Sequence, residues 1–226
     1  MKFTYYGHSC FSVLIGNTRI LFDPFITPNE LAKNVDINYI EPDYIFVSHG
    51  HYDHITDVVL LAKKKDATVV GSWELNAWFD KNGLKKTQAL NPGGQFEFGF
   101  GRVKCVGAQH SSSFADGSYA GVACGFLFQT TEGNFYYSGD TGLTMDMQLI
   151  PHWVKLDFAV FPIGDVLTMG VDDAITAAQF VKVQKVIGVH YDTFGLIKID
   201  HERAIESFRK ANLTLNLLEI GTVTDI

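Results

Sequence analysis

The stretch Ser48-His49-Gly50-His51-Tyr52-Asp53-His54 decides the fold and carries most of the chemistry. It follows the apolar run Tyr44-Ile45-Phe46-Val47, whose length and unbroken character predict a strand covered on both faces. Because alternate residues of an extended loop point to the same side, His49 and His51 can face one pocket while Asp53 and His54 face a second. Imidazole and carboxylate together predict a divalent transition-metal site, and they suit zinc, manganese, iron and nickel alike.

Outside this loop the hydrophobic pattern alternates between strand and helix. Strands are expected at residues 3–7, 11–15 and 19–23, followed after the loop by a helix at 55–65 and a strand at 67–71. Residues 86–138 read as a meander of strands with glycine-rich turns, and the last third predicts strands at 158–161, 186–189 and 215–219 with helices at 173–183 and 201–211. Strands in both halves, with helices outside them, predict two sheets packed face to face between helical layers.

The composition fits one compact domain spanning residues 1–226. Hydrophobic residues make up 46% of the 226-residue chain and charged residues 19%, which is enough apolar material for a single core. The net charge of −7 and the scattered basic residues argue against a nucleic-acid partner, since such binding needs clustered lysine and arginine. A small-molecule substrate is the expected partner, and a homo-oligomer stays open.

The cysteines and the N-terminus bear on the compartment. Cys10, Cys105 and Cys124 form neither an even set nor a CxxC pair, which favours a reducing environment over a disulfide scaffold. The apolar stretch at 10–21 is interrupted by polar residues, and no segment approaches the roughly 20 apolar residues of a membrane span. We therefore expect a cytoplasmic protein with no membrane partner.

Three further polar residues stand near predicted strand ends. They are His110 in Ala108-Gln109-His110-Ser111-Ser112-Ser113, Asp140 in Tyr137-Ser138-Gly139-Asp140-Thr141-Gly142, and His190 in Gly188-Val189-His190-Tyr191. Together with the 48–54 loop, these segments resemble the ordered motifs of the metallo-β-lactamase superfamily. The resemblance spans nearly the whole chain, and it implies a four-layer αββα sandwich, an α/β fold with a metal cleft along one edge.

Two further segments narrow the resemblance. Tyr6-Gly7-His8-Ser9-Cys10-Phe11 and residues 139–147 are similar to a branch of stand-alone hydrolases that is related to ascorbate-6-phosphate lactonase. The resemblance implies that His49, His51 and His110 hold one metal ion, that Asp53, His54 and His190 hold another, and that Asp140 bridges the two. We expect two divalent cations, with zinc favoured over manganese, iron and nickel.

The function that follows is metal-dependent hydrolysis of a small ester, lactone, amide or phosphoester, because paired cations can make water a nucleophile at neutral pH. Asp53 and His8 are the candidates for direct catalytic work. His8 is open to two interpretations, a residue facing the cleft or a hydrogen-bonded structural histidine. The hydroxyls of Ser111, Ser112 and Ser113 can bind an anionic group or simply form a turn. Two other functions stay open, a di-iron redox enzyme and a module that binds its ligand through metals without consuming it.

Overall fold

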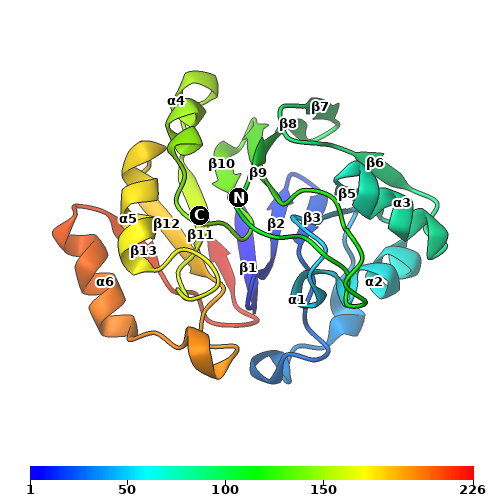
Figure 1. Cartoon of the computed structure of the whole chain (residues 1–226), viewed down its shortest axis with the longest axis horizontal. Coiled ribbons are helices and arrows are strands. Elements are labelled where there is room, and N and C mark those ends of the chain that lie inside the picture. The colour runs from blue at the N-terminus through cyan, green and yellow to red at the C-terminus, as the bar shows by residue number, and fades with distance from the viewer.

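The computed structural model describes residues 1–226, and its strands form two seven-stranded sheets that pack face to face (Figure 1). The first sheet has the order β14-β1-β2-β3-β4-β5-β6 and the second has the order β13-β12-β11-β10-β9-β8-β7. The first sheet consists of β1 (Lys2–Gly7), β2 (Cys10–Ile15), β3 (Thr18–Phe22), β4 (Tyr44–Phe46), β5 (Thr68–Gly71), β6 (Thr87–Ala89) and β14 (Val223–Asp225). The second consists of β7 (Gln95–Phe98), β8 (Gly101–Gly107), β9 (Cys124–Thr130), β10 (Gly133–Tyr137), β11 (Phe158–Pro162), β12 (Lys185–Val189) and β13 (Thr214–Asn216).

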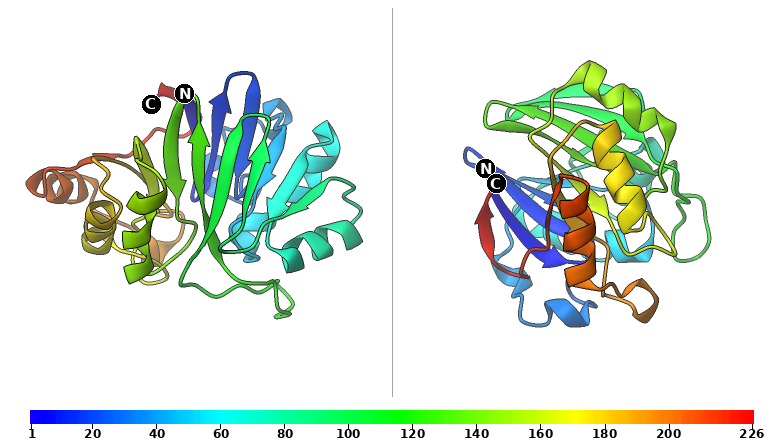
Figure 2. Two further views of the ribbon diagram at one scale, coloured as in Figure 1. Left: turned by 90° about the horizontal axis from the view of Figure 1, so that it is seen from above. Right: turned by 90° about the vertical axis from the view of Figure 1, so that its left-hand side faces the viewer.

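Helices cover the outer face of each sheet, which completes the four layers (Figure 2). On the first sheet, α2 (Val58–Lys65) contacts β4 and β5, and α3 (Trp73–Lys81) contacts β5 and β6. On the second sheet, α5 (Val171–Phe180) contacts β11 and α6 (His201–Lys210) contacts β13. The short α4 (Ile150–Trp153) continues from the 3-10 helix η3 (Met145–Leu149). The predicted αββα layering is therefore confirmed.

The main core lies between the sheets and is strongly aromatic. Phe22 of the first sheet packs edge-on against Phe128 of the second, with ring centroids 5.4 Å apart, and Phe46 does the same against Phe126 at 5.1 Å. Along β4, Phe46 belongs to this core while Ile45 belongs to a second cluster beneath α2 and α3. Both faces of β4 are thus covered, as its unbroken apolar sequence predicts.

Two predictions about elements were wrong in detail. The helix expected at 55–65 is divided into α1 (Tyr52–Ile55) and α2, and Asp57 stands between them with its carboxylate accepting the backbone N–H groups of Ile26 and Thr27 at 2.6 and 2.9 Å. The local apolar spacing could not predict that Asp57 hydrogen-bonds the backbone of residues 26 and 27. The expected meander over 86–138 is also interrupted, because β6 pairs in parallel with β5 in the first sheet and residues 108–123 form an irregular loop.

Besides three short 3-10 helices, three elements lie outside every predicted range. They are α3, the η3–α4 segment and the edge strand β14, which pairs antiparallel with β1. Two more 3-10 helices, η1 (Glu30–Ala32) and η2 (Ile37–Tyr39), precede β4, and η4 (Gly195–Ile197) follows β12.

Candidate metal centre

The candidate ligands follow five different strands and meet in two groups. His8 follows β1, the 49–54 loop follows β4, His110 comes after β8, Asp140 after β10 and His190 directly after β12. One group consists of His49, His51 and His110, and the other of His8, Asp53, His54 and His190. A third possible set, Asp23, His49 and His54, combines one histidine of each group with a further carboxylate. Within each group one ligand atom per residue lies within 4.8 Å of the others.

Asp140 lies where the two groups meet. Its Oδ2 atom is 2.9 Å from His190 Nε2 and 3.2 Å from His54 Nε2, and it is 3.8 Å from His110 Nε2 in the other group. The carboxylate is buried, with 3% of the side chain exposed. One oxygen therefore approaches imidazoles from both groups, which is the placement a bridging ligand requires.

The group of His49, His51 and His110 lies closer to the surface. His49 is fully buried and His51 and His110 are partly exposed, and His49 Nε2 is 2.8 Å from His51 Nδ1. Two imidazole nitrogens that both donate cannot face each other so closely, so at least one lone pair points into the gap. Burial lowers the pKa of all three imidazoles, and nearby histidines add to the effect. Neutral imidazoles with free lone pairs are what a cation binds.

Asp23 is a functional residue that the sequence reasoning missed. Its fully buried carboxylate accepts the backbone N–H of Ser48 at 2.8 Å, the Ser48 hydroxyl at 2.6 Å and the Tyr137 hydroxyl at 2.5 Å. It also lies 2.8 Å from His54 Nδ1. When His54 donates its Nδ1–H to Asp23, its Nε2 turns toward Asp140 as a potential ligand. The only sequence signal was an acidic residue at the end of an apolar strand.

The electrostatics around His54 favour a bound cation. Burial by itself lowers the pKa of His54, but the carboxylates of Asp140, Asp23 and Asp53 outweigh it and raise that pKa well above its usual value. The pKa of Asp140 is held well below its usual range, since His190 and His54 overcome the effect of burial. Three carboxylates around one buried imidazole attract a cation, and a divalent metal ion satisfies them more fully than one proton does.

Unpartnered polar atoms support the same conclusion. His54 Nε2 and Asp140 Oδ1 are both buried and have no hydrogen-bond partner. Buried polar groups in folded proteins almost always find a partner, so two such atoms in one cleft call for an explanation. Their chemistry, an imidazole nitrogen and a carboxylate oxygen, matches that of zinc and related divalent ions. The residues therefore fit a bound metal.

His8 lies in the same group as the candidate ligands Asp53, His54 and His190. Its Nε2 is 2.8 Å from Asp53 Oδ2, its Nδ1 is 3.1 Å from the Thr193 hydroxyl, and its side chain is fully buried. Burial, with a contribution from His190, lowers the pKa of His8 to about 4, although Asp53 opposes the shift. A neutral His8 can donate Nε2–H to Asp53 and accept the Thr193 hydroxyl at Nδ1.

The three serines after His110 have different environments. The Ser112 hydroxyl accepts the backbone N–H of Gly50 at 3.1 Å and donates to the Ala120 carbonyl at 3.2 Å, so it holds the metal-binding loop in place. Ser113 forms an isolated bridge with Tyr119. Only Ser111 is exposed beside the ligands, with its hydroxyl 3.3 Å from His51 Nε2.

Comparison with known proteins shows the family to which these features belong. The model of the β-lactamase superfamily domain matches residues 18–191, which include all seven expected metal ligands but not His8. A UPF0173 metal-dependent hydrolase from Christiangramia forsetii is 48% identical over 222 residues, covering 98% of each chain. The chain belongs to the UPF0173 metal-dependent hydrolases. Membership in the metallo-β-lactamase superfamily, inferred from the sequence motifs, is thereby confirmed.

Solved structures share the architecture of this UPF0173 hydrolase over its whole length. Igni18, a metallo hydrolase from the archaeon Ignicoccus hospitalis, superposes with a TM-score of 0.89 at 28% identity and covers 99% of this chain and 97% of its own. The metallo-β-lactamase fold protein YhfI from Bacillus subtilis superposes with a TM-score of 0.77 at 16% identity, covering 99% of this chain and 98% of its own, and shows the fold alone. In the UPF0173 hydrolase itself, no helix has both the length and the apolar character needed to cross a bilayer.

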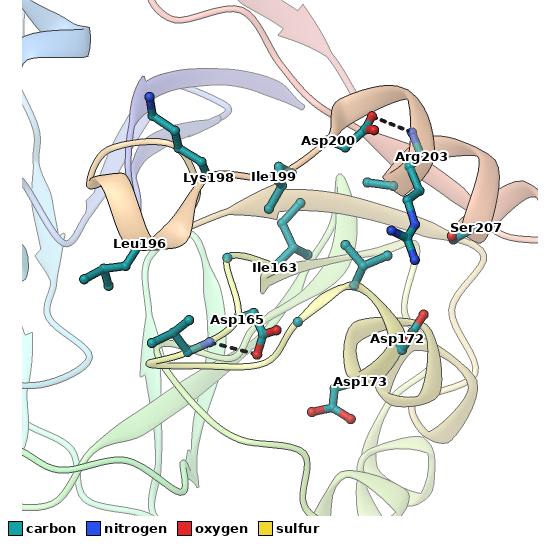
Figure 3. Close-up of a pocket in the computed structure, with 15 residues that line it drawn as sticks. Ile163, Asp165, Asp172, Asp173, Leu196, Lys198, Ile199, Asp200, Arg203 and Ser207 are labelled. Carbon is teal, nitrogen blue, oxygen red and sulfur yellow. Dashed lines mark hydrogen bonds between the residues drawn. The ribbon is translucent and has the colours of Figure 1, made fainter.

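A separate cavity of about 450 Å³ adjoins the metal cleft of the UPF0173 hydrolase (Figure 3). In it, Arg203 of α6 lies across from Asp172 and Asp173 of α5, and none of the candidate metal ligands lines its wall. Gly164 separates it from the cleft: a Cβ atom there would lie 2.1 Å from the His190 carbonyl oxygen. The cavity is therefore distinct from the metal centre although it shares a wall with it.

Proposed function

We propose that this metal-dependent hydrolase uses two divalent cations to cleave a small ester, lactone, amide or phosphoester. The observation that carries the proposal is the placement of Asp140, whose Oδ2 approaches imidazoles of both ligand groups. In this proposal His49, His51 and His110 hold one cation, Asp53, His54 and His190 hold the other, and Asp140 bridges them. Zinc is the expected metal, since three imidazoles or two imidazoles and a carboxylate are common zinc sites.

When bound, the pair of cations lowers the pKa of water and polarises the oxygen of the bond to be cleaved. The chain's own residues then have two tasks, to fix the positions of the reactants and to move protons. Asp53 is the more accessible of the two cleft carboxylates, with 20% of its side chain exposed against 3% for Asp140. It is therefore the carboxylate that a proton leaving the nucleophile, or a proton going to the leaving group, can reach.

His8 acts through Asp53 in this scheme. With Nε2–H donated to Asp53 Oδ2 and Nδ1 held by Thr193, the imidazole fixes the orientation of that carboxylate. We therefore assign Asp53 as the catalytic residue and His8 as a positioning residue. The buried Asp23 has the same relation to His54, because it accepts the Nδ1–H and leaves Nε2 for the cation.

The test combines metal analysis with an activity screen. Protein purified without added metal is analysed by mass spectrometry for metal content and is assayed on lactones, carboxylic esters, amides and phosphodiesters. We expect close to two divalent ions per chain and turnover of at least one substrate class, lost on chelation and restored by added zinc or manganese. His51→Ala is compared with His152→Ala, a surface histidine on α4.

The two variants make the outcome decisive. His51→Ala should lose metal and activity together, while His152→Ala should retain both. Full metal content and full activity in His51→Ala would refute the assignment of the site. Fully metal-loaded wild type that turns over no substrate class, yet binds and releases one unchanged, would refute hydrolysis and favour a binding module.

A further inference from the structure

Three aromatic rings from distant parts of the chain pack in series beside His8, with the buried Phe25 in the middle. Phe25 is buried, its ring centroid 5.5 Å from that of His8, 5.6 Å from that of Tyr52 and 6.3 Å from that of Phe194. The Phe194 ring also packs edge-on against His8, with centroids 5.4 Å apart. We call Phe25, Tyr52 and Phe194 the aromatic shelf.

The shelf borders the reacting groups. Tyr52 lies between the candidate ligands His51 and Asp53 in the sequence, and Phe194 contacts the histidine that bonds Asp53. Both outer rings are open to solvent, with 53% of Tyr52 and 38% of Phe194 exposed. Scattered exposed aromatics need no explanation, but two that share one buried ring at the edge of a catalytic cleft form a patch suited to binding a ligand.

The residues that carry or directly flank the candidate ligands include no lysine or arginine, and the basic residues that follow them along the chain, Lys33 and Lys198, are exposed. Lys198 lines the separate cavity described above. Neither lysine nor arginine occurs in 7–10, 22–32, 48–54, 108–123, 138–145, 163–170 or 190–197, the segments that carry or flank the candidate ligands. Segment 163–170 belongs with them because the Met169 N–H donates to the carbonyl of Thr141, next to Asp140, at 2.9 Å. Proteins usually recognise a phosphate or carboxylate group with arginine or lysine. A negatively charged substrate group beside the candidate ligands would therefore find no lysine or arginine in these segments to pair with.

We propose that the aromatic shelf binds an uncharged aryl or alkyl group of the substrate, next to the ester, lactone or amide bond that is cleaved. This inference rests on the proposed hydrolytic function and narrows it to substrates whose non-reacting part is apolar. The substrate's apolar group covers Tyr52 and Phe194, and its reacting carbonyl lies toward Asp53 and Asp140. Phosphorylated substrates of the same size are poor substrates, because their charge meets an aromatic surface and not a cation.

Two matched substrate series test the proposal. The first consists of γ-lactones with alkyl or phenylalkyl tails of increasing length, and the second of γ-lactones that carry a phosphate at the end of the tail. Since burying one methylene is worth about 0.8 kcal/mol, kcat/KM should rise by about 2- to 4-fold per carbon until the shelf is covered. The phosphate-bearing lactone should be turned over at least about 10-fold less efficiently than its uncharged counterpart.

Variants assign the effect to the shelf. Phe194→Ala and Tyr52→Ala should each reduce the ratio of kcat/KM between long-tailed and short-tailed lactones by about 5- to 10-fold, and mainly through KM. Tyr39→Ala is the matched control, because Tyr39 is 82% exposed and lies on η2, away from the shelf. The control should keep the wild-type ratio.

A binding measurement separates this inference from the proposed function. A cyclic ether analogue of the long-tailed lactone, which cannot be hydrolysed, is titrated calorimetrically into wild type and Phe194→Ala. Binding that is weakened at least about 5-fold in the variant supports the shelf even if no lactone is turned over. Turnover with no dependence on tail length, a preference for the phosphate-bearing series, or equal analogue binding in wild type and Phe194→Ala would overturn the proposal and leave hydrolysis standing.

Discussion

The two halves of the proposed metal centre are built in different ways. The inner half, made by Asp53, His54 and His190, has imidazoles with 0% and 1% of their side chains exposed and is held from behind by Asp23 and His8. The outer half, made by His49, His51 and His110, has two partly exposed imidazoles, and its hydroxyl neighbour Ser111 lies at the surface. Asp140 is the residue that approaches both halves.

The difference in burial predicts different roles for the two halves. Buried ligands with hydrogen-bonded partners keep one geometry, because each alternative would leave a charge or a donor unsatisfied. Partly exposed ligands can exchange their contacts with water, so the outer half is the side at which solvent and metal enter most easily. The inner half should therefore contribute to the stability of the fold as well as to metal binding, and the outer half to metal binding alone.

The largest effect should come from removing the group that both halves share. Asp140→Ala takes away the carboxylate near His54, His190 and His110, so the two proposed cations would each lose a ligand and would repel each other without compensation. We expect metal content to fall well below one ion per chain and activity to fall by more than about 100-fold, beyond the range typical of supporting residues. Mass spectrometry of the purified variant measures the metal. Retention of both ions would show that the halves are independent sites.

A pair of histidine substitutions compares the halves directly. His54→Ala leaves Asp23 and Asp140 buried without their imidazole partner and should lower the free energy of unfolding of the metal-free protein by about 3–5 kcal/mol. His51→Ala, in the outer half, should change it by less than about 1 kcal/mol while still reducing metal content. Urea unfolding in the presence of a chelator gives both numbers. Equal destabilisation by the two variants would contradict the proposed difference in roles.

Asp23→Asn examines the support behind the inner half. The amide keeps the size of the side chain but loses the charge that orients His54 and accepts the Tyr137 hydroxyl. Affinity for the inner cation should fall by about 10- to 100-fold, the usual cost of losing such a partner. Competition with a chelating dye should resolve two classes of site in the variant, one of them with wild-type affinity. A uniform weakening of both classes would place the effect in the fold as a whole.

Asp23 also shows where sequence reasoning reached its limit. The candidate ligands could be named because the 48–54 loop concentrates histidine and aspartate, and because His110, Asp140 and His190 lie in segments that resemble the motifs of the metallo-β-lactamase superfamily. Asp23 directly follows a strand, but its partners Ser48, His54 and Tyr137 lie 25 to 114 residues away. No local pattern records such a convergence of distant segments.

The same limit applies to the fold, of which the local features could be predicted and the long-range contacts could not. The αββα layering followed from alternating strands and helices, because period and length are local properties. The break between α1 and α2 depends on Asp57 serving the loop at Ile26, and the parallel pairing of β6 with β5 depends on a crossover through α3. Both features depend on contacts between residues that are far apart in the sequence. The aromatic shelf also depends on such contacts, since its three rings come from residues 25, 52 and 194.

The smallest expected effects concern two neighbouring serines in the outer half. Ser112 accepts the Gly50 N–H and donates to the Ala120 carbonyl. Ser112→Ala removes this partner of the Gly50 N–H and leaves the Ala120 carbonyl with the Ser72 hydroxyl at 3.5 Å, so it should cost about 1–2 kcal/mol of stability. Ser111 only borders His51 at the surface, and Ser111→Ala should change stability by less than about 0.5 kcal/mol. Thermal unfolding of the two metal-free variants compares them under one condition. If Ser111→Ala were the more destabilising, the outer half would have structural support that its exposure does not suggest, and the contrast with the inner half would weaken.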